Sequence, residues 1–337
     1  MSSGEPAPPV PDPFEDTFVA PIAARAVVAA IALGVFDSLA REPAEPGALA
    51  DRLGLDPVGM EPLATALVSL GYLECDELGV LRPSRAAERL LVRGSPESIA
   101  TFAGDFGRHH WDAMGSLEDA LRGQRPAWHD RGADDPLWPA YIRGLFELSR
   151  HEQDANAALV AASDPTQLLD LAGGHGGFAM AMCRRHPALR ATVVELPGAA
   201  HVGREIVADE GYAKRVYFQE GDLFEVELGS GHDVVSTFNL LHHLPAERIL
   251  ELFRRARTAL RPGGCLIVGD TDRPAPGDPV SQVGALTGLA FYAESRARTY
   301  SLAEIEHSLG ETGFAEVRVH RNERSPWRVV IAATAPE

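Results

Sequence analysis

The sequence predicts an α/β protein in which a mostly parallel sheet follows a smaller, helical module. Three observations support this prediction. From Gln167 onward, short apolar runs alternate with amphipathic stretches, which is the pattern of parallel strands covered by helices on both faces. A glycine-rich turn, Ala172–Gly177, follows the first of these runs. The region before residue 100 instead shows helical stretches followed by a hairpin pattern.

The composition narrows the classes to which the chain can belong. Its 337 residues, 45% of them hydrophobic, suffice for two domains or for one large domain with an extension. A net charge of -17 argues against nucleic acid or an anionic membrane as the main partner. No apolar run approaches the ~20 residues that span a membrane, and no signal peptide is apparent. The 3 scattered cysteines suit a reducing compartment, so we expect a cytoplasmic protein.

The first hundred residues are predicted to form a winged-helix-like module. Residues 1–13 are rich in proline and are expected to be a disordered arm. The expected helices are 16–33, 47–53 and 57–70, with a break at 34–37, and the expected hairpin strands are 71–75 and 79–83. A winged helix suggests DNA binding, but the helix at 57–70 contains no Lys or Arg to contact phosphates. We therefore expect an apolar module that pairs with its own copy in a homodimer.

Residues 96–163 are predicted to be mostly helical and are rich in aromatic side chains. Aromatic residues at helical spacing are most often core residues, although some, such as Tyr141 and Phe146, could line an apolar substrate pocket. His109 and His110 suggest a metal site. Adjacent histidines point to different faces of a helix, however, and rarely chelate one ion. We therefore expect no metal.

The glycine turn is the predicted centre of the chemistry. Leu168–Leu171 predicts a buried strand with Asp170 near its end, and Ala191–Val194 predicts a second strand that ends in Glu195. A carboxylate at the end of the second strand can accept hydrogen bonds from both hydroxyls of a ribose. Tight packing between strand and helix would explain the glycines alone, but not the two acids.

Asp170 distinguishes between two ligands for this turn. In a dinucleotide site, the glycines and a helix N-terminus hold a pyrophosphate. A carboxylate directly before the glycines would repel a pyrophosphate, whereas it suits a ligand that carries an ammonium or sulfonium group. The sequence therefore favours S-adenosylmethionine over a nicotinamide dinucleotide.

The rest of the chain continues the alternation of strands and helices. The later strands are predicted at 216–219, 233–237, 265–268, 317–319 and 328–332, and the helices at 199–210, 245–261 and 302–309. In open parallel sheets, ligands bind at the carboxyl ends of the strands. The side chains expected at these ends are Asp170, Glu195, Asp222, Phe238, His242 and Asp270.

Six segments carry a family resemblance, namely DLAGGHGG, VVELP, EGDLFE, FNLLHHLP, LRPGGCLIVGD and ETGF. In this order they resemble the plant caffeic-acid type of S-adenosylmethionine-dependent O-methyltransferase, in its bacterial small-molecule branch, over nearly the whole chain. The resemblance implies a Rossmann-like class I methyltransferase sheet of seven mostly parallel strands behind a winged-helix-like dimerisation domain. The implied parts are an arm (1–13), the dimerisation domain (14–100), a helical linker with substrate-pocket helices (101–163) and the catalytic domain (164–337).

The resemblance also implies roles for single residues. His242 is implied as the general base, and Asp270 as the acid that orients it. The residues implied to contact S-adenosylmethionine, or its product S-adenosylhomocysteine, are Ser149, Asp170, Gly173, Gly174, Gly176, Glu195, Leu196, Gly221, Asp222, Leu223, Phe224, Phe238 and Asn239. Asp170 would lie near the ammonium, Glu195 at the ribose and Asp222 at the adenine. The residues implied to contact a small-molecule acceptor are Trp111, Met114, Tyr141, Leu145, Phe291 and Tyr292.

The chain departs from the family pattern at several positions. Ala172 replaces the first glycine of the loop, and His243 stands where the plant enzymes have an aspartate. The second acid that flanks the histidine base has no clear counterpart. The nearest alignment gives Ala297 or Thr299, and Glu294 is close in sequence but displaced.

Three functions follow from the sequence. O-methylation of a small aromatic, secondary-metabolite acceptor with His242 as base is the first. The second is C- or N-methylation of an indole, enol or similar molecule on the same scaffold. A non-methylating relative is the third. Independently of these, His242 could simply cap the helix that starts at Pro245.

Overall fold

The computed structural model describes residues 13–124, 131–322 and 325–336. The expected arm at 1–13 therefore lies almost entirely outside the described residues. The chain divides into two compact units, Met1–Arg108 and His109–Glu337, while the finer domain boundaries stay predictions. Within the described residues, no single helix is long and apolar enough to cross a membrane; Thr17–Ala32 and Val35–Arg41 meet that criterion only as a pair bent by 57°.

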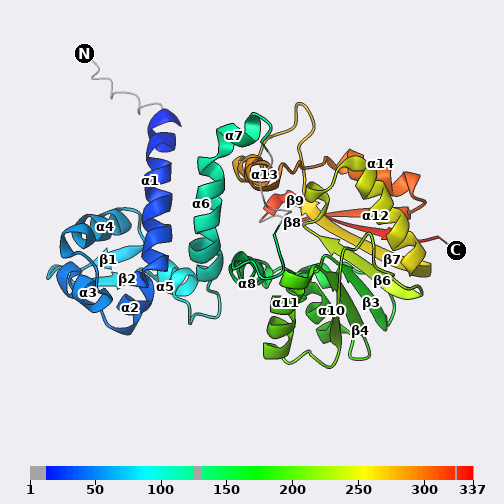
Figure 1. Ribbon diagram of the computed structural model, residues 1–337, viewed down its shortest axis with the longest axis horizontal. Coiled ribbons are helices and arrows are strands. Elements are labelled where there is room, and N and C mark those ends of the chain that lie inside the picture. Colours follow the sequence, from blue (N-terminus) through cyan, green and yellow to red (C-terminus); the bar gives the residue numbers. More distant parts are fainter. Residues whose placement is uncertain (1–12, 125–130, 323–324, 337) are drawn as a thin grey trace, which may run out of the picture. The chain divides into compact units, whose positions relative to one another are not determined.

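The N-terminal unit has the helices and the hairpin that the sequence predicts (Figure 1). Its elements are α1 (Pro13–Ala32), α2 (Val35–Arg41), α3 (Pro46–Leu53), α4 (Pro57–Ser69), β1 (Leu73–Cys75), β2 (Leu81–Pro83), α5 (Arg85–Leu91) and the π-helical turn η1 (Thr101–Phe106). Asp56 caps α4, because its side chain accepts a hydrogen bond from the amide of Val58 at 3.0 Å. The predicted break is shorter than expected. It is confined to the turn at Gly34, which has φ 75°, because Val35 and Phe36 already belong to α2 and are buried in the core of this unit.

The second unit is built on a seven-stranded sheet in its described part, with strand order β5-β4-β3-β6-β7-β9-β8. The strands are β3 (Gln167–Leu171), β4 (Arg190–Glu195), β5 (Val216–Glu220), β6 (His232–Phe238), β7 (Leu260–Thr271), β8 (Ala315–Asn322) and β9 (Ser325–Thr334). The strands from β5 to β7 are parallel, and β9 pairs antiparallel with both β7 and β8. The predicted fold is thus confirmed. One boundary differs, since β7 begins at Leu260, where the sequence predicts the end of a helix.

Helices cover both faces of this sheet, as Figure 1 shows. The helices that pack on it are α8 (Leu137–Ser149), α9 (Gln153–Ala157), α10 (Gly177–Arg185) and α11 (Pro197–Asp209) in one core, and α12 (Ala246–Ala259) and α14 (Leu302–Glu311) in the other. The remaining helices that follow η1 are α6 (Gly107–Gly115), α7 (Leu117–Leu121) and α13 (Gln282–Ser295). The turn η3 (Leu241–His243) is a 3₁₀ helix. Helix α13 was not predicted, because its apolar residues show no amphipathic period that marks a helix.

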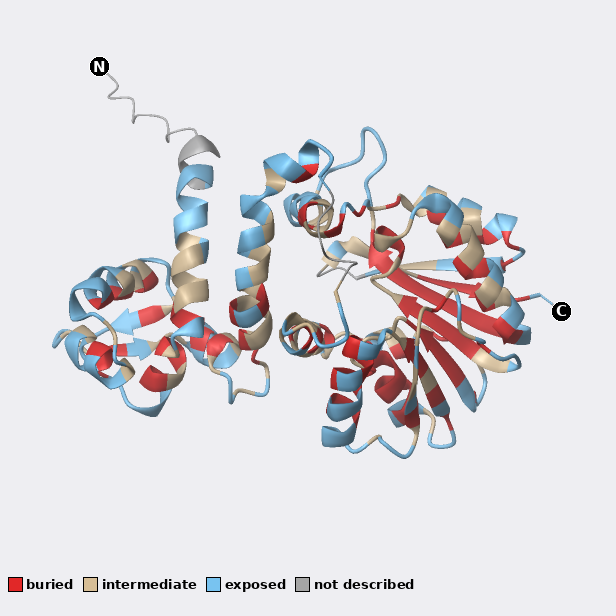
Figure 2. Cartoon of the chain, viewed as in Figure 1, coloured by how far each residue is buried: buried red, intermediate tan, exposed pale blue. Residues whose placement is uncertain are grey.

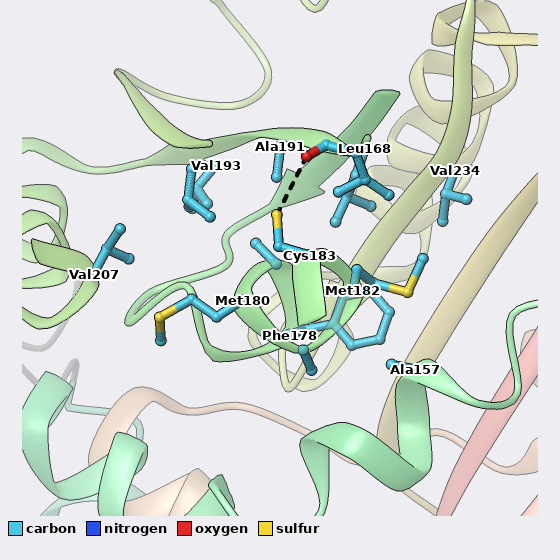
Figure 3. Packing of buried hydrophobic residues seen from close by; sticks show 14 of the residues in the cluster. Ala157, Leu168, Phe178, Met180, Met182, Cys183, Ala191, Val193, Val207 and Val234 are labelled. Carbon is cyan, nitrogen blue, oxygen red and sulfur yellow. Dashed lines mark hydrogen bonds between the residues drawn. The ribbon is translucent and has the colours of Figure 1, made fainter. Parts of the chain in front are cut away.

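The sheet separates two hydrophobic cores, and its central strands are buried along most of their length (Figure 2). On one side, Phe178 and Met182 of α10 pack with Leu168 of β3 (Figure 3). On the other side, Leu252 and Phe253 of α12 are fully buried. Because both faces are covered, the strands expose mainly their carboxyl ends, which is where a ligand can reach them.

Helix α11 approaches the glycine turn closely through Gly203. A Cβ atom at this position would lie 2.4 Å from the carbonyl oxygen of Gly174 and 2.6 Å from the ring of Phe218. We predict that Gly203→Ala lowers the free energy of unfolding by about 1–3 kcal/mol, because backbone must shift to admit the methyl group. Urea unfolding measures this change.

Gly310→Ala is the matched control. Gly310 lies in the last turn of α14, and nothing lies within 4 Å of a Cβ atom placed there. We expect this substitution to change stability by less than ~1 kcal/mol. Equal stability of the two variants would contradict the close packing of α11 on the glycine turn.

Candidate active site

A cavity of about 390 Å³ opens at the carboxyl ends of the central strands. It brings together most of the residues that the resemblance implies for the cofactor, together with two implied for the acceptor. The implied residues that line it are Tyr141, Leu145, Ser149, Asp170, Gly173, Gly174, Glu195, Leu196, Gly221, Asp222, Leu223, Phe224, Phe238 and Asn239. Gly176 does not line the cavity; it is the residue before α10, with φ 71°. Trp111, Met114, His242, Asp270, Phe291 and Tyr292 also lie outside its lining.

Asp170 lies in the parallel ladder of β3 and is 1% exposed. Its Oδ1 accepts a hydrogen bond of 2.6 Å from the hydroxyl of Ser236, whereas its Oδ2 has no hydrogen-bond partner among the described residues. Burial raises the pKa of this carboxyl to about 7, although the bond from Ser236 acts in the opposite direction. A buried acceptor without a partner, on the wall of a cavity, fits a cationic ligand group.

The glycine turn follows Asp170 and bends sharply around it. Ala172 has φ 53°, a left-handed conformation that favours glycine, which explains why the family pattern has glycine at this position. A Cβ atom at Gly173 would lie 2.4 Å from Asp170 Oδ2. The turn therefore leaves the carboxylate space that a larger residue would fill.

Glu195 ends β4 beside this turn. Its Oε2 accepts a hydrogen bond of 2.9 Å from the amide of Gly174, and its Oε1 accepts one of 2.7 Å from the amide of Leu196. Burial raises the pKa of this carboxyl, and the two backbone bonds lower it. The carboxylate is thus held in place while it faces the cavity, in the position that a ribose requires.

Asp222 comes after β5 and lines one end of the cavity together with Phe224 and Arg248. Its Oδ1 accepts a hydrogen bond of 2.8 Å from the amide of Phe224. The guanidinium of Arg248 lies 3.6 Å from the ring centroid of Phe224. This end combines a carboxylate with flat, polarisable groups, which suits an adenine and its amino group.

His175, inside the glycine turn, was not assigned a role from the sequence. Its Nδ1 accepts a hydrogen bond of 2.9 Å from the amide of Gly177, so the proton of the neutral ring is on Nε2, which donates to Ser149 Oγ at 3.1 Å. Burial lowers the pKa of this imidazole to about 4. His175 is therefore neutral, and it anchors the end of α8 to the turn.

His242 and Asp270 form a buried pair beside the cavity. His242 lies in η3 and Asp270 in β7, and they are 2% and 3% exposed. Their Nδ1 and Oδ1 atoms are 2.7 Å apart, so the carboxylate fixes the proton on Nδ1 and leaves Nε2 as the basic atom. Helix α12 has Pro245 at its N-cap and no side-chain cap. His242 therefore does not cap this helix.

Helix α13 contacts both histidines of η3. The ring of Phe291 stacks on the imidazole of His242, with centroids 3.8 Å apart and planes 2° apart. Ser295 Oγ donates to the carbonyl oxygen of Phe291 at 3.0 Å and lies 3.2 Å from Nδ1 of His243. Because the hydroxyl proton of Ser295 is used in the first bond, Nδ1 of His243 is the donor in the second. His243, unlike His242, lines the cavity.

Glu294 does not replace the missing second acid beside His242. It instead forms an ion pair with Nδ1 of His110, which raises the pKa of that imidazole against the effect of burial. The carboxylate also contributes, after burial, to the raised pKa of the Tyr141 phenol. Ala297 and Thr299, the positions that align with the second acid of the family, carry no carboxylate. The acid that contacts His242 is Asp270.

The remaining residues implied for the acceptor lie on α6 and α13. Trp111 and Met114 of α6 are 40% and 36% exposed. The hydroxyl of Tyr292 donates to the carbonyl oxygen of Ala120 at 3.2 Å and so joins α13 to α7. In the described part of the chain, no group of three or more His, Cys, Asp or Glu side chains is placed to hold a metal ion.

The comparison with known families decides the class of this protein. A model of the O-methyltransferase domain matches residues 120–315, and a model of the O-methyltransferase dimerisation domain matches residues 17–93. The chain belongs to the O-methyltransferase family. The family implies S-adenosylmethionine, and the orphaned Oδ2 of Asp170 and the glycine turn fit this cofactor. The protein is thus an S-adenosylmethionine-dependent methyltransferase.

Relatives of this chain are named for different reactions, among them a methyl transfer and a hydroxylation. The methyltransferase is 29% identical over 307 residues to the 3-hydroxy-5-methyl-1-naphthoate 3-O-methyltransferase of Streptomyces sahachiroi, covering 88% of this chain and 87% of the relative. It is 33% identical over 294 residues to the aclacinomycin 10-hydroxylase RdmB of Streptomyces purpurascens, covering 80% and 77%. The crystal structure of human N-acetylserotonin methyltransferase in complex with SAM superposes with a TM-score of 0.84 at 21% identity, covering all of both chains, and shows the same fold.

The raised pKa of Asp170 gives a pH dependence that can be measured. In the folded, ligand-free protein the pKa is about 7, above that of the unfolded chain. The proton is therefore held below that pH, and this group's contribution to stability is lost as the pH rises from the unfolded pKa toward the folded one. A cationic ligand group favours the ionised form, so its binding releases the proton below about pH 7.

We predict that S-adenosylhomocysteine binds about fivefold or more tightly at about pH 8 than at about pH 6. Calorimetry in buffers with different ionisation enthalpies measures both the affinity and the released proton. Asp170→Asn should remove the proton release. Binding without proton release and without pH dependence in the unaltered protein would contradict the assignment of Asp170 to a cationic group.

Proposed function

We propose that the protein transfers the methyl group of S-adenosylmethionine to a hydroxyl oxygen of a small aromatic acceptor, with His242 as the general base. The observation that carries this proposal is the buried pair of His242 and Asp270 next to the cofactor cavity. The relative that acts on a hydroxynaphthoate is consistent with an aromatic, secondary-metabolite acceptor.

The proposed mechanism asks little of the protein beyond position and one proton transfer. The cofactor supplies a methyl group that its sulfonium already activates. Asp170 would hold its methionine part and Glu195 its ribose at the strand termini, so that the acceptor meets the methyl group in line. Nε2 of His242 takes the hydroxyl proton of the acceptor, and Asp270 stabilises the resulting imidazolium.

Phe291 has a place in this proposal because it covers His242. The imidazole of His242 is only 2% exposed, and the ring of Phe291 is stacked on it. An acceptor therefore contacts the imidazole only after Phe291 moves. The acceptor ring would then take the space of a phenyl ring, which favours a flat, aromatic substrate. Leu145 and Tyr141, which line the cavity, offer apolar and aromatic surface for such a ring.

We expect His242→Ala to lower turnover about 100-fold or more, while the affinity for S-adenosylhomocysteine stays unchanged. A higher pH should partly restore turnover, because a phenol with a pKa near 10 is then ionised without help. The assay measures S-adenosylhomocysteine release with a panel of phenols. His307→Ala is the control, since this histidine of α14 has a side chain that is 75% exposed. Unaltered turnover in His242→Ala between about pH 6 and about pH 9 would exclude His242 as the base.

We also propose that the protein is a homodimer formed through its N-terminal unit. Support comes from the match to a dimerisation domain at residues 17–93. Helix α1 exposes apolar side chains in this range, with Val19 at 54% and Ile22 at 65% exposure.

A cytoplasmic location is consistent with Cys75, Cys183 and Cys265, which are all free thiols.

We predict that light scattering gives about twice the chain mass of 36.2 kDa at micromolar concentration. Ile22→Asp should shift the protein toward the monomer, because the charge would be buried between two copies. Val58→Asp on α4 is the matched control, since Val58 is 77% exposed and lies on another helix. A monomeric mass for the unaltered protein would contradict the proposal.

A further inference from the structure

Three carboxylates line the cavity, so an anionic group of a ligand must find its positive charge or hydrogen-bond donors on other side chains. Asp170, Glu195 and Asp222 are the acids. The methionine part of the cofactor carries both an ammonium and a carboxylate. Asp170 is the proposed partner of the ammonium, but no acid can hold the carboxylate. This part of the ligand requires a cation or several hydrogen-bond donors.

Among the described residues that line the cavity, two are arginines and none is a lysine. Arg248 lies over Phe224, next to Asp222, at the end that suits the adenine. Arg328 lies on β9, opposite Thr271 at the end of β7, and so belongs to the edge of the sheet where the central strands end. The guanidinium groups of Arg248 and Arg328 are therefore expected at different ends of the cavity.

The guanidinium of Arg328 is held by two polar neighbours. Its Nη1 donates to Glu152 at 2.9 Å, and its Nη2 donates to the side-chain oxygen of Asn239 at 3.1 Å. The side chains of Arg328 and Glu152 are only 24% and 28% exposed. A guanidinium has five donors, so these two bonds fix its orientation and leave donors for a ligand.

Gln153 provides a second, independent observation at this end of the cavity. The residue is 7% exposed, lines the cavity and has no hydrogen-bond partner for its Oε1 among the described residues. Its Cγ would lie 3.5 Å from a Cβ atom placed at Gly177, so it adjoins the start of α10. Together with Oδ2 of Asp170, it provides two buried acceptors without partners. An ammonium, which has three donors, can satisfy both.

We infer that Arg328 binds the carboxylate of the cofactor's methionine part, while Asp170 and Gln153 accept hydrogen bonds from its ammonium. The inference goes beyond the acceptor chemistry and rests only on the proposed place of the ammonium at Asp170. Arg328 is a residue of the last strand, far in sequence from the glycine turn. Glu152 neutralises it in the free protein and keeps it oriented when the carboxylate binds.

The test compares two ligands that differ in this group. S-adenosylhomocysteine carries the amino-acid part, and 5′-methylthioadenosine lacks it. We expect Arg328→Gln to lower the preference for S-adenosylhomocysteine over 5′-methylthioadenosine about tenfold or more in calorimetry. The affinity for 5′-methylthioadenosine should change less than about twofold. A role in folding alone would weaken both ligands equally.

Two further variants make the result decisive. Arg321→Gln is the matched control, because Arg321 of β8 pairs with Asp272 and does not line the cavity; it should leave the preference unchanged. Arg328→Lys keeps the charge but not the planar fork, so we expect an intermediate preference. If Arg328→Gln does not fold, the ligand preference of Arg328→Lys alone tests the inference.

An unchanged preference in the Arg328 variants, or an equal loss for both ligands, would overturn the inference. Failure of the unaltered protein to bind 5′-methylthioadenosine would contradict the adenosine site at Glu195 and Asp222 instead. The two failures are therefore distinguishable.

Discussion

The active site depends on the close approach of one glycine turn to two carboxylates. The amide of Gly174 donates to Glu195, and the missing side chain of Gly173 leaves room for Asp170. Gly203 lets α11 pack directly on this turn. Because β3 and β4 are parallel neighbours, their acids reach the same edge of the sheet. The fold thus brings two carboxyl groups together, an arrangement that suits a cationic ligand group.

The same edge also places the proposed base, His242, outside the cavity. The cavity is lined from strands that include β3, β4, β6 and β9, and from α8. His242 and Asp270 lie outside its lining, and Phe291 of α13 stacks on His242. Helix α13 contacts His242, His243 and His110 through three different side chains, namely Phe291, Ser295 and Glu294. A shift of this one helix would therefore alter the surroundings of all three imidazoles together.

Most of the fold, and the two acids beside the glycine turn, could be predicted from the sequence because local patterns encode them. Strand, glycine turn and acid are contiguous, and Asp170 and Glu195 indeed line one cavity. The contacts of Glu294 could not be predicted, because its partner His110 is distant in the chain. Arg328 gave no local signal either, since a strand arginine becomes part of the cavity only through the antiparallel pairing of β9 with β7. Helix α13 was missed because its apolar residues lack a clear period.

The proposed reaction is transfer of a methyl group to an aromatic hydroxyl oxygen. Incubation of the protein with S-adenosylmethionine labelled at the methyl carbon, and with a panel of phenols, indoles and enols, tests it most directly. We expect labelled methyl ethers of phenols, seen by carbon NMR, together with an equal amount of S-adenosylhomocysteine. Label on nitrogen or ring carbon would contradict transfer to oxygen. A hydroxylated product without S-adenosylhomocysteine would contradict methyl transfer itself.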